Sequence, residues 1–365
     1  PACELPKTGN YATMQVGAYP ILIVRGGDGK IRAFHNVCRH RGQRLCSKPN
    51  GTTPKLVCPY HQWTYELDGK LLYARDMGDD FDASKFGLKT VHCVELNGMV
   101  FVCLAQVPPA IADLAKQLSS YLAPSQLNDA KIAYSSTIVE NGNWKLVIEN
   151  NRECYHCGGS HPSLCRTYSD NPRMTAMEGP DSASPDILAH WQRCEDAGLP
   201  SRFVNHPKMQ WRLARIPLLN NAESYTLSTK AAVAKRMGSM PFNDAGSLLF
   251  FNYPNTWNHF LADHAIVFRV LPISPTETQV TTNWLVHKDA VEGVDYDIET
   301  LTRVWINTND EDRQVVEENQ KGILSPAYEP GPYSSIQEEG VVQFIDWYAG
   351  TMIDRLSPTP AMAAE

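Results

Sequence analysis

Four residues in the first third of the chain combine cysteine and histidine at short spacing. Cys38 is followed by His40, and Cys58 is followed by His61. A [2Fe–2S] cluster with mixed ligands takes two cysteines on one iron and two histidines on the other. Each short motif can therefore send its Cys to one iron and its His to the next. The sequence predicts such a cluster, held between two loops that converge.

A structural zinc site is the main alternative for these residues. A Cys2His2 zinc finger pairs like ligands with like, whereas each half of this pattern mixes Cys and His. The flanking pairs Arg41-Gly42 and Gln62-Trp63 also favour a Rieske-type cluster. A respiratory Rieske protein is a lesser alternative, because such proteins carry an extra Cys pair and a membrane anchor. Here Cys46 has no evident mate, and no anchor is visible.

A second group of metal-binding residues begins with Glu153, His156 and His161. We expect a helix over 143–157, on which His156 lies one turn from Glu153 and faces the same way. Gly158-Gly159 should end this helix, so that His161 can return toward His156. Two His and one carboxylate on Fe(II) leave positions open for dioxygen and substrate. The carboxylate ligand must come from elsewhere in the chain.

The 10 cysteines invite a disulfide interpretation, which we reject. A chain of 365 residues can bury its own core, and disulfide frameworks belong to small secreted domains. Cys154 and Cys157 could bind zinc or do redox work, but we expect them to be small packing residues beside His156. The others should be small hydrophobic residues in a reducing cytoplasm: Cys3, Cys46, Cys93, Cys103, Cys165 and Cys194.

Bulk properties exclude several other classes of protein. The net charge of -7 argues against a nucleic-acid partner, because phosphate binding requires a basic surface. The longest apolar run, Gly98 to Ala105, falls well short of the ~20 residues that a membrane span needs. No signal peptide is visible. Pro1 is not Met, and a strand is already expected at 11–16, so we expect a truncated N-terminus.

The elements that must position these residues divide into two regions. Residues 11–107 are predicted to be all-β, Pro108-Pro109 to mark a boundary, and 111–122 to be a helical connector. We expect a Rieske domain over 1–107, a connector over 108–130, a catalytic domain over 131–356 and a disordered tail over 357–365. The fold class is therefore α+β, with an all-β domain followed by an antiparallel sheet and flanking helices.

The pattern of apolar residues predicts the individual elements. Residues 166–207 are predicted to be a long excursion over the active site. A helix is expected over 296–321, with Gly322 as its stop. Strands are expected at 20–25, 31–35, 63–65, 71–73, 99–104, 131–140, 210–216, 223–229, 247–253, 264–271 and 278–287.

The two motifs together resemble the oxygenase α subunits of Rieske non-heme iron oxygenases, over essentially the whole chain. The iron motif of that family is Asp-x2-His-x4-His, and Glu153, His156 and His161 match it with Glu in place of Asp. The resemblance implies a distal Asp ligand on a late helix, five residues before a Glu, which Asp312 and Glu317 fit. Asp310 is the alternative. The resemblance to this family also implies a helix-grip, START-like catalytic domain.

The resemblance further implies how electrons travel. A reductase with flavin and iron–sulfur groups would pass electrons from NADH to the cluster. Glu153 would link His156 to His61 of the neighbouring subunit, in a ring-shaped homotrimer. The alternative for Glu153 is a solvated acid on a helix.

A finer resemblance is to the glycine betaine monooxygenases and the stachydrine (proline betaine) demethylases. It is carried by residues 149–157, 253–260, 284–296 and 326–333, and implies oxidative N-demethylation of a betaine with release of formaldehyde. Aromatic faces recognise a quaternary ammonium through cation–π attraction. Trp257 is the first candidate, followed by Phe260 and Tyr253. The alternative for each is an ordinary core aromatic.

Two other functions stay in view. The same machinery could hydroxylate or O-demethylate an aromatic acid, or dihydroxylate a ring. A non-enzymatic electron carrier would use only the cluster, and leaves the second ligand set unexplained. Iron content separates the two classes, with two irons per chain for a carrier and three for an oxygenase.

Overall fold

The computed structural model describes residues 1–171, 183–208 and 210–356, so the expected tail lies outside the described residues. The chain forms two compact units. The first comprises residues 1–132 with 271–273, and the second comprises the rest of the described chain. The division falls after Ile132, so the whole expected connector, including helix α1 (Ala112–Tyr121), lies in the first unit. The functional boundaries stay predictions.

The first unit is built of antiparallel strands. A six-stranded sheet has the order β4-β1-β2-β3-β8-β9, and a three-stranded sheet has the order β5-β6-β7. The strands are β1 (Asn10–Val16), β2 (Tyr19–Arg25), β3 (Ile31–His35), β4 (Asn50–Thr52), β5 (Leu56–Val57), β6 (Thr64–Tyr65), β7 (Leu71–Tyr73), β8 (Thr90–Leu96) and β9 (Met99–Cys103). Strand β2 is buried on both faces, because alternate side chains enter two separate apolar clusters.

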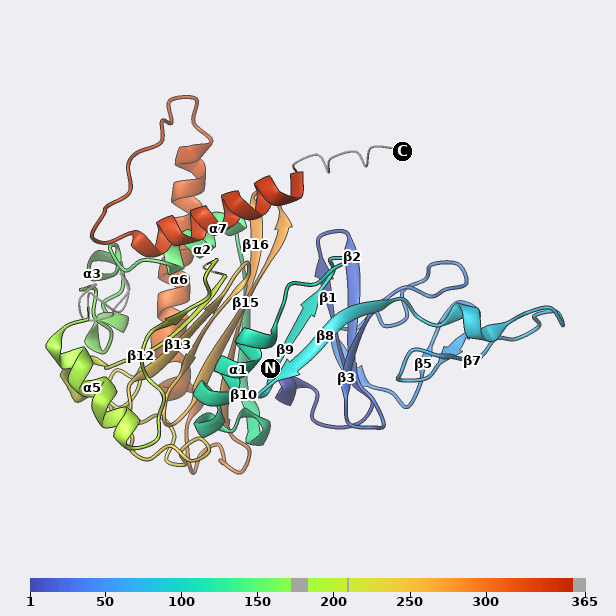
Figure 1. Ribbon diagram of the computed structural model, residues 1–365, viewed down its shortest axis with the longest axis horizontal. Helices are drawn as coiled ribbons and strands as arrows, with labels where there is room; N and C mark the ends of the chain where they lie inside the picture. Colours follow the sequence, from blue (N-terminus) through green and yellow to red (C-terminus); the bar gives the residue numbers. More distant parts are fainter. Residues whose placement is uncertain (172–182, 209, 357–365) are drawn as a thin grey trace, which may run out of the picture. The chain divides into compact units, whose positions relative to one another are not determined.

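The second unit contains a seven-stranded sheet of order β10-β16-β15-β14-β13-β12-β11. Its first and last strands in the sequence are neighbours, as the adjacent teal and orange ribbons of Figure 1 show. The strands are β10 (Ala130–Glu140), β11 (Val204–Asn205), β12 (Trp211–Ile216), β13 (Ser247–Asn252), β14 (Thr256–Phe260), β15 (Ala265–Ser274) and β16 (Glu277–His287). The helices are α2 (Trp144–Asn151), α3 (Cys157–Ser160), α5 (Pro185–Asp196), α6 (Ile298–Ile323) and α7 (Glu339–Leu356).

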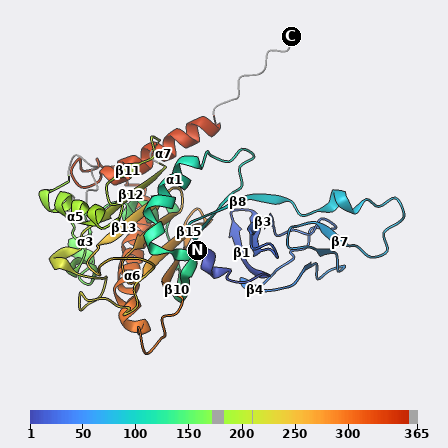
Figure 2. The same cartoon turned by 60° about the horizontal axis from the view of Figure 1, so that its bottom comes forward.

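Helix α6 closes the core of the second unit. Its N-cap residue is Asp297, whose carboxylate accepts a hydrogen bond from Thr300 N at 2.8 Å. Leu301, Val304 and Trp305 share one apolar cluster with side chains of the sheet. The helix runs along the sheet in both views (Figures 1 and 2). Its inner face is therefore set by packing against the strands.

Several predicted elements differ from those observed. The strand expected at 223–229 is wrong, because Thr226 turns its hydroxyl to Lys230 O at 2.7 Å and the segment folds on itself. Strand β14 was not expected, since Asn258 and His259 interrupt its apolar pattern. Helices α5 and α7 were also missed, the first within the predicted excursion. Gly322 does not stop α6, which continues to Ile323.

Candidate metal centres

Two loops of the first unit share one backbone geometry. Cys38 N donates to Gln43 O at 2.8 Å, and Cys58 N donates to Trp63 O at 2.8 Å. The residue four positions after each Cys returns its N–H to the carbonyl of that Cys, at 3.1 Å for Gly42 and 2.9 Å for Gln62. Both of these residues have positive φ, 79° and 61° respectively. Matching loops of this kind can present their side chains to one shared group.

The side chains of these loops fit a cluster held by two Cys and two His. Both cysteines are buried and unbridged, while the His40 and His61 rings lie 4.6 Å apart. The Nδ1 atom of His61 is buried without a hydrogen-bond partner among the described residues, as expected of an atom that faces a ligated group. Burial and the nearby Cys38 raise the pKa of the Cys58 thiol, so a positive partner is required to hold a thiolate there.

Neighbouring residues fix these ligands from behind. The Tyr65 hydroxyl lies 3.3 Å from Cys38 Sγ and accepts a hydrogen bond from Arg39 N at 3.0 Å. The indole of Trp63 stacks on the His40 ring with centroids 4.9 Å apart. Sequence reasoning named Trp63 as a flanking residue but missed Tyr65. The signal for Tyr65 was only its strand position two residues after Trp63.

In the second unit, His156 and His161 meet a carboxylate that is distant in the sequence, that of Asp312. His156 Nε2 lies 3.0 Å from His161 Nε2 and 3.3 Å from Asp312 Oδ1, and His161 Nε2 lies 3.0 Å from the same oxygen. His161 is 1 % exposed. Asp310, the alternative carboxylate, instead pairs with Arg313 at 3.1 Å. Glu317 accepts hydrogen bonds from the backbone and side chain of Asn141.

These separations fit one metal ion bound on three sides. Neighbouring ligands at right angles, each about 2.1 Å from an ion, lie about 3.0 Å apart, against about 3.4 Å in a tetrahedron. Two of the three observed separations are 3.0 Å and the third is 3.3 Å. Two imidazoles and one carboxylate on one face are the donor set of non-heme Fe(II) oxygenases. An ion held by these three residues would keep positions open for other ligands.

Each imidazole has a second carboxylate behind it. His156 Nδ1 donates to Glu153 Oε1 at 2.6 Å, and His161 Nδ1 donates to Glu311 Oε2 at 2.8 Å. Such partners fix the tautomer that leaves Nε2 free for a metal. Burial lowers the pKa of His156, but its hydrogen bonds to Asp312 and Glu153 outweigh burial and raise the pKa to about 9. Sequence reasoning identified Glu153 and missed Glu311, which differs from other helix acids only in its register.

The local backbone differs from the expected long helix. Helix α2 ends at Asn151, so Glu153 and His156 lie in the turn that follows rather than on one helical face. The Glu153 carboxylate accepts hydrogen bonds from the backbone N–H groups of Tyr155 and His156, which closes this turn. Gly158 and Gly159 lie inside the short helix α3 rather than ending a helix. The two imidazoles still converge, because the turn replaces the expected helical face.

Cys154 and Cys157 form a disulfide, which corrects the expectation that they are unpaired packing residues. The 3-residue separation had been weighed only as a sign of zinc binding or redox work, but it also brings the two Cα atoms to 4.9 Å, within the range of a disulfide. Cys157 Sγ lies within 4.8 Å of donor atoms of His156 and His161. Its sulfur is bonded to Cys154, however, so it offers no thiolate, and Asp312 is the better third donor.

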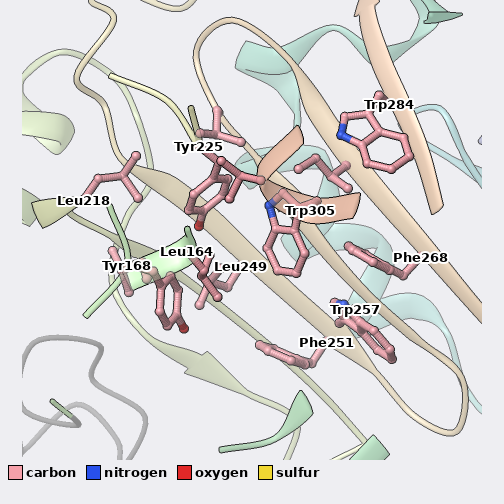
Figure 3. Packing of buried hydrophobic residues seen from close by; sticks show 14 of the residues in the cluster. Leu164, Tyr168, Leu218, Tyr225, Leu249, Phe251, Trp257, Phe268, Trp284 and Trp305 are labelled. Carbon is pink, nitrogen blue, oxygen red and sulfur yellow. The ribbon is translucent and has the colours of Figure 1, made fainter. Parts of the chain in front are cut away.

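Aromatic side chains gather in the buried cluster between the sheet and α6 (Figure 3). Trp257 stacks on Phe268 at 4.8 Å, and Trp305 of α6 lies 5.2 Å from Phe268. Among the described residues, the indole N–H groups of Trp257 and Trp305 are buried without a partner. Trp305 and Asp312 lie seven residues apart on α6 and so share a face. Trp257, Phe268 and Trp305 form an aromatic wall. Helix α6 contributes Trp305 to this wall from the same face that carries Asp312.

The other two aromatic candidates are not stacked with Trp257. Phe260 is directly opposite Leu248, while Trp257 is opposite Phe251. Odd and even positions of a strand point to opposite faces, so Phe260 is on the far face from Trp257. Tyr253 is buried against Phe344 and Trp347 of α7, with centroids 5.2 and 5.1 Å away. The structure therefore does not bring Phe260 into this aromatic wall.

None of the described helices is long and apolar enough to cross a membrane.

Comparisons with known proteins agree with this geometry. Residues 127–353 match the family described as "Ring hydroxylating alpha subunit (catalytic domain)", and residues 1–92 match the "Rieske [2Fe-2S] domain". The glycine betaine monooxygenase oxygenase subunit of Chromohalobacter salexigens is 52 % identical, over 97 % of this chain and 80 % of that one. The subunit of the same name from Pseudomonas aeruginosa (strain UCBPP-PA14) is 48 % identical, over 98 % and 84 %.

Solved structures support the fold. One solved structure is that of a quaternary ammonium Rieske monooxygenase, reported for its insights into carnitine oxidation and inter-subunit electron transfer. It has a TM-score of 0.70 at 24 % identity, over 95 % of this chain and 86 % of that one. Naphthalene 1,2-dioxygenase from Rhodococcus sp. has a TM-score of 0.68 at 18 % identity, over 98 % and 88 %. The expected α+β architecture, an all-β domain followed by a sheet with flanking helices, is confirmed.

Proposed function

Because the chain belongs to the Rieske-type ring-hydroxylating oxygenase α-subunit family, we propose that it is the terminal oxygenase that removes a methyl group from a quaternary ammonium betaine. Glycine betaine is the favoured substrate, given the named relatives, and proline betaine is the alternative. The enzyme is a monooxygenase, and its two domains imply a [2Fe–2S] cluster and a mononuclear iron.

Seven residues would hold these groups. Cys38, His40, Cys58 and His61 would hold the cluster, and His156, His161 and Asp312 would hold the iron. When bound, the cluster supplies single electrons and the iron supplies activation of dioxygen. Glu153 and Glu311 hold the Nδ1 protons of the two imidazoles and so direct each Nε2 toward the iron.

One observation carries the choice of substrate class. Helix α6 presents Asp312 to the two histidines and, on the same face, Trp305 to a buried aromatic group. That group includes Trp257 and Phe268, stacked 4.8 Å apart. A trimethylammonium group cannot accept a hydrogen bond, so aromatic faces are its natural partners. Trp257 would contact the ammonium, while Phe260 lies on the other face of the sheet and Tyr253 against α7.

The overall reaction balances with one dioxygen and two electrons. Glycine betaine, dioxygen, NADH and one proton give dimethylglycine, formaldehyde, NAD⁺ and water. A flavin and iron–sulfur reductase would deliver the electrons. Glu153 would carry them to His156 from His61 of a neighbouring subunit in a homotrimer. A cytoplasmic location would give the reductase access to NADH. The hydrogen bond from His156 to Glu153 supplies the near half of that route.

A single-turnover experiment tests this function. The protein is reduced, freed of reductant and mixed with oxygen plus glycine betaine, proline betaine or benzoate, and formaldehyde is measured. We expect formaldehyde from one betaine, up to one per reduced site, and none from benzoate. Hydroxylated benzoate without formaldehyde from either betaine would instead support the aromatic-acid alternative.

Two variants locate the ammonium site and the electron route. Trp257→Leu should raise the KM for the betaine by about 5- to 30-fold, because one desolvated cation–π contact is lost. Phe260→Leu, a similar change on the opposite face, is the matched control and should leave KM within about twofold. Glu153→Gln should retain iron and cluster but slow cluster reoxidation by substrate and oxygen. Unchanged reoxidation would contradict the role given to Glu153.

A further inference from the structure

A row of side chains crosses the inner face of the seven-stranded sheet. Arg212 of β12 is directly opposite Phe251 of β13, which is directly opposite Trp257 of β14. Trp257 in turn stacks on Phe268 of β15. Directly opposed residues share one face of a sheet. The row therefore has a guanidinium at one end and the proposed ammonium-binding aromatics at the other.

A second guanidinium lies over the middle of this row. The Cζ atom of Arg152 is 4.2 Å from the centre of the Phe251 ring and 5.7 Å from that of Tyr253. Arg152 is 1 % exposed. Among the residues that the structure describes, its Nε and both terminal nitrogens have no hydrogen-bond partner. Arg152 immediately precedes Glu153, so this buried cation lies beside the turn that carries His156.

The two arginines differ in their hydrogen-bond partners. Arg212 donates to Gln343 Oε1 at 3.3 Å and lies over Phe203 at 4.5 Å. Burial and the charge of Arg152 lower the pKa of Arg212 to about 9. A buried charge normally has a hydrogen-bonded counterion. The Arg152 guanidinium lies over an aromatic ring, and none of its nitrogens has a hydrogen-bond partner among the described residues, so its five N–H donors form a place for an anion.

We propose that Arg152, with Arg212 beside it, binds the carboxylate of the substrate while Trp257 contacts its ammonium. This inference deepens the proposed function and rests on it. The two charges of glycine betaine are one methylene apart, so their partners must be close neighbours. Phe251, which carries Arg152 on its face, and Trp257 are such neighbours, because opposed residues have Cβ atoms about 4.5–5.5 Å apart. The planar fork of Arg152 suits two-point binding of a carboxylate.

The experiment compares glycine betaine with choline, in which a hydroxymethyl group replaces the carboxylate. Dissociation constants are measured by calorimetry on the full chain loaded with both metal groups. The wild-type protein should bind glycine betaine at least about 10-fold more tightly than choline. In Arg152→Gln, affinity for glycine betaine should fall by about 10- to 100-fold while affinity for choline changes less than about threefold, because charge-assisted hydrogen bonds are lost.

Arg215→Gln is the matched control. Arg215 is also fully buried on β12 but is opposite Leu248, on the other face of the sheet. Its substitution should leave the ratio of the two dissociation constants unchanged. Arg152→Lys, which keeps charge but loses the fork, should give an intermediate ratio. If Arg152→Gln does not fold, Arg152→Lys and Arg212→Gln replace it in this comparison of dissociation constants.

The outcomes separate this inference from the function on which it rests. Turnover of glycine betaine, with an unchanged ratio in the Arg152 and Arg212 variants or with no wild-type preference over choline, would overturn the carboxylate site alone. A wild-type protein that binds neither compound would overturn the proposed function and the inference together. A loss of preference in Arg215→Gln equal to that in Arg152→Gln would also contradict the site.

Discussion

The two metal regions of this chain are assembled in opposite ways. The four cluster residues lie within one stretch of 24 positions, from Cys38 to His61, on two loops with the same backbone hydrogen bonds. The iron residues come from a turn after α2, from the end of α3 and from the middle of α6. The first site depends on local loop conformation, whereas the second depends on how α6 packs on the sheet. We therefore expect the second site to be the more sensitive to distant changes in its core.

Replacing one ligand in each site should have the largest effect, and it tests whether the two sites are independent. Asp312→Ala should lower iron from about three to about two per chain and reduce formaldehyde formation more than about 100-fold, while the cluster spectrum is retained. Cys58→Ser should remove the spectrum and leave about one iron. Metal analysis and absorption spectra of both variants measure the effect. Asp310→Asn, on the same helix but paired with Arg313, is the control and should keep all the iron. Loss of both metal groups in either variant would show that the sites are coupled.

Glu311→Gln is a smaller change on α6, which removes a hydrogen-bond partner of an iron ligand and not the ligand itself. The Glu311 carboxylate accepts the Nδ1 proton of His161 at 2.8 Å. Replacing it with an amide should weaken iron binding by about 10- to 100-fold, as is usual for partners of metal-bound histidines. Chelator competition at fixed pH measures the change. Glu318→Gln, which changes an exposed acid farther along α6, provides the reference. Equal iron affinity in the two variants would contradict a role for Glu311.

Iron binding at the second site should depend strongly on pH. In the metal-free protein the pKa of His156 is raised to about 9, despite burial, by Asp312 and Glu153. Its proton must leave before a metal binds, and so must that of His161, whose pKa is also raised, despite burial, by Asp312 and Glu311. Affinity should therefore rise at least about tenfold per pH unit up to about pH 9 and then level off. Burial and the charge of Asp312 raise the pKa of Glu140 to about 8, and its ionisation acts in the same direction. Titration of the apo protein with Fe(II) under argon tests this slope, and a flat profile would contradict it.

The smallest expected effect concerns the cluster loops. Gly42 has a φ of 79°, and a Cβ there would meet no neighbouring atom. Gly42→Ala should therefore cost only backbone strain, about 1–2 kcal/mol, and lower the thermal midpoint by a few degrees. Gly27→Ala is the control, because Gly27 is equally open and does not have positive φ. Calorimetric scans of the two variants should differ, and equal midpoints would contradict the strain argument.

Sequence reasoning reached much of the fold, because strands and long helices leave periodic patterns. Strands such as 20–25, 31–35 and 278–287 were expected close to their observed bounds. Strand β14 was missed because polar Asn258 and His259 lie in it, and their burial depends on neighbours on both sides. The helix expected over 143–157 ended early, since the Glu153 carboxylate bonds to the backbone that follows it. Local side-chain hydrogen bonds of this kind compete with helix formation.

The sequence by itself determined which residue types could bind metal and how they are spaced. The pairs Cys38 with His40 and Cys58 with His61 are close enough that local turns place them, and His156 and His161 share one short segment. The resemblance favoured Asp312 over Asp310, and the tertiary structure adds that Asp312 lies beside both histidines while Asp310 pairs with Arg313. Only the tertiary structure placed Glu311 behind His161 and set Arg152 over Phe251. These choices depend on the rotation of α6 and on the register of the sheet. Both are set by packing between segments that are separated in the sequence, which no local pattern encodes.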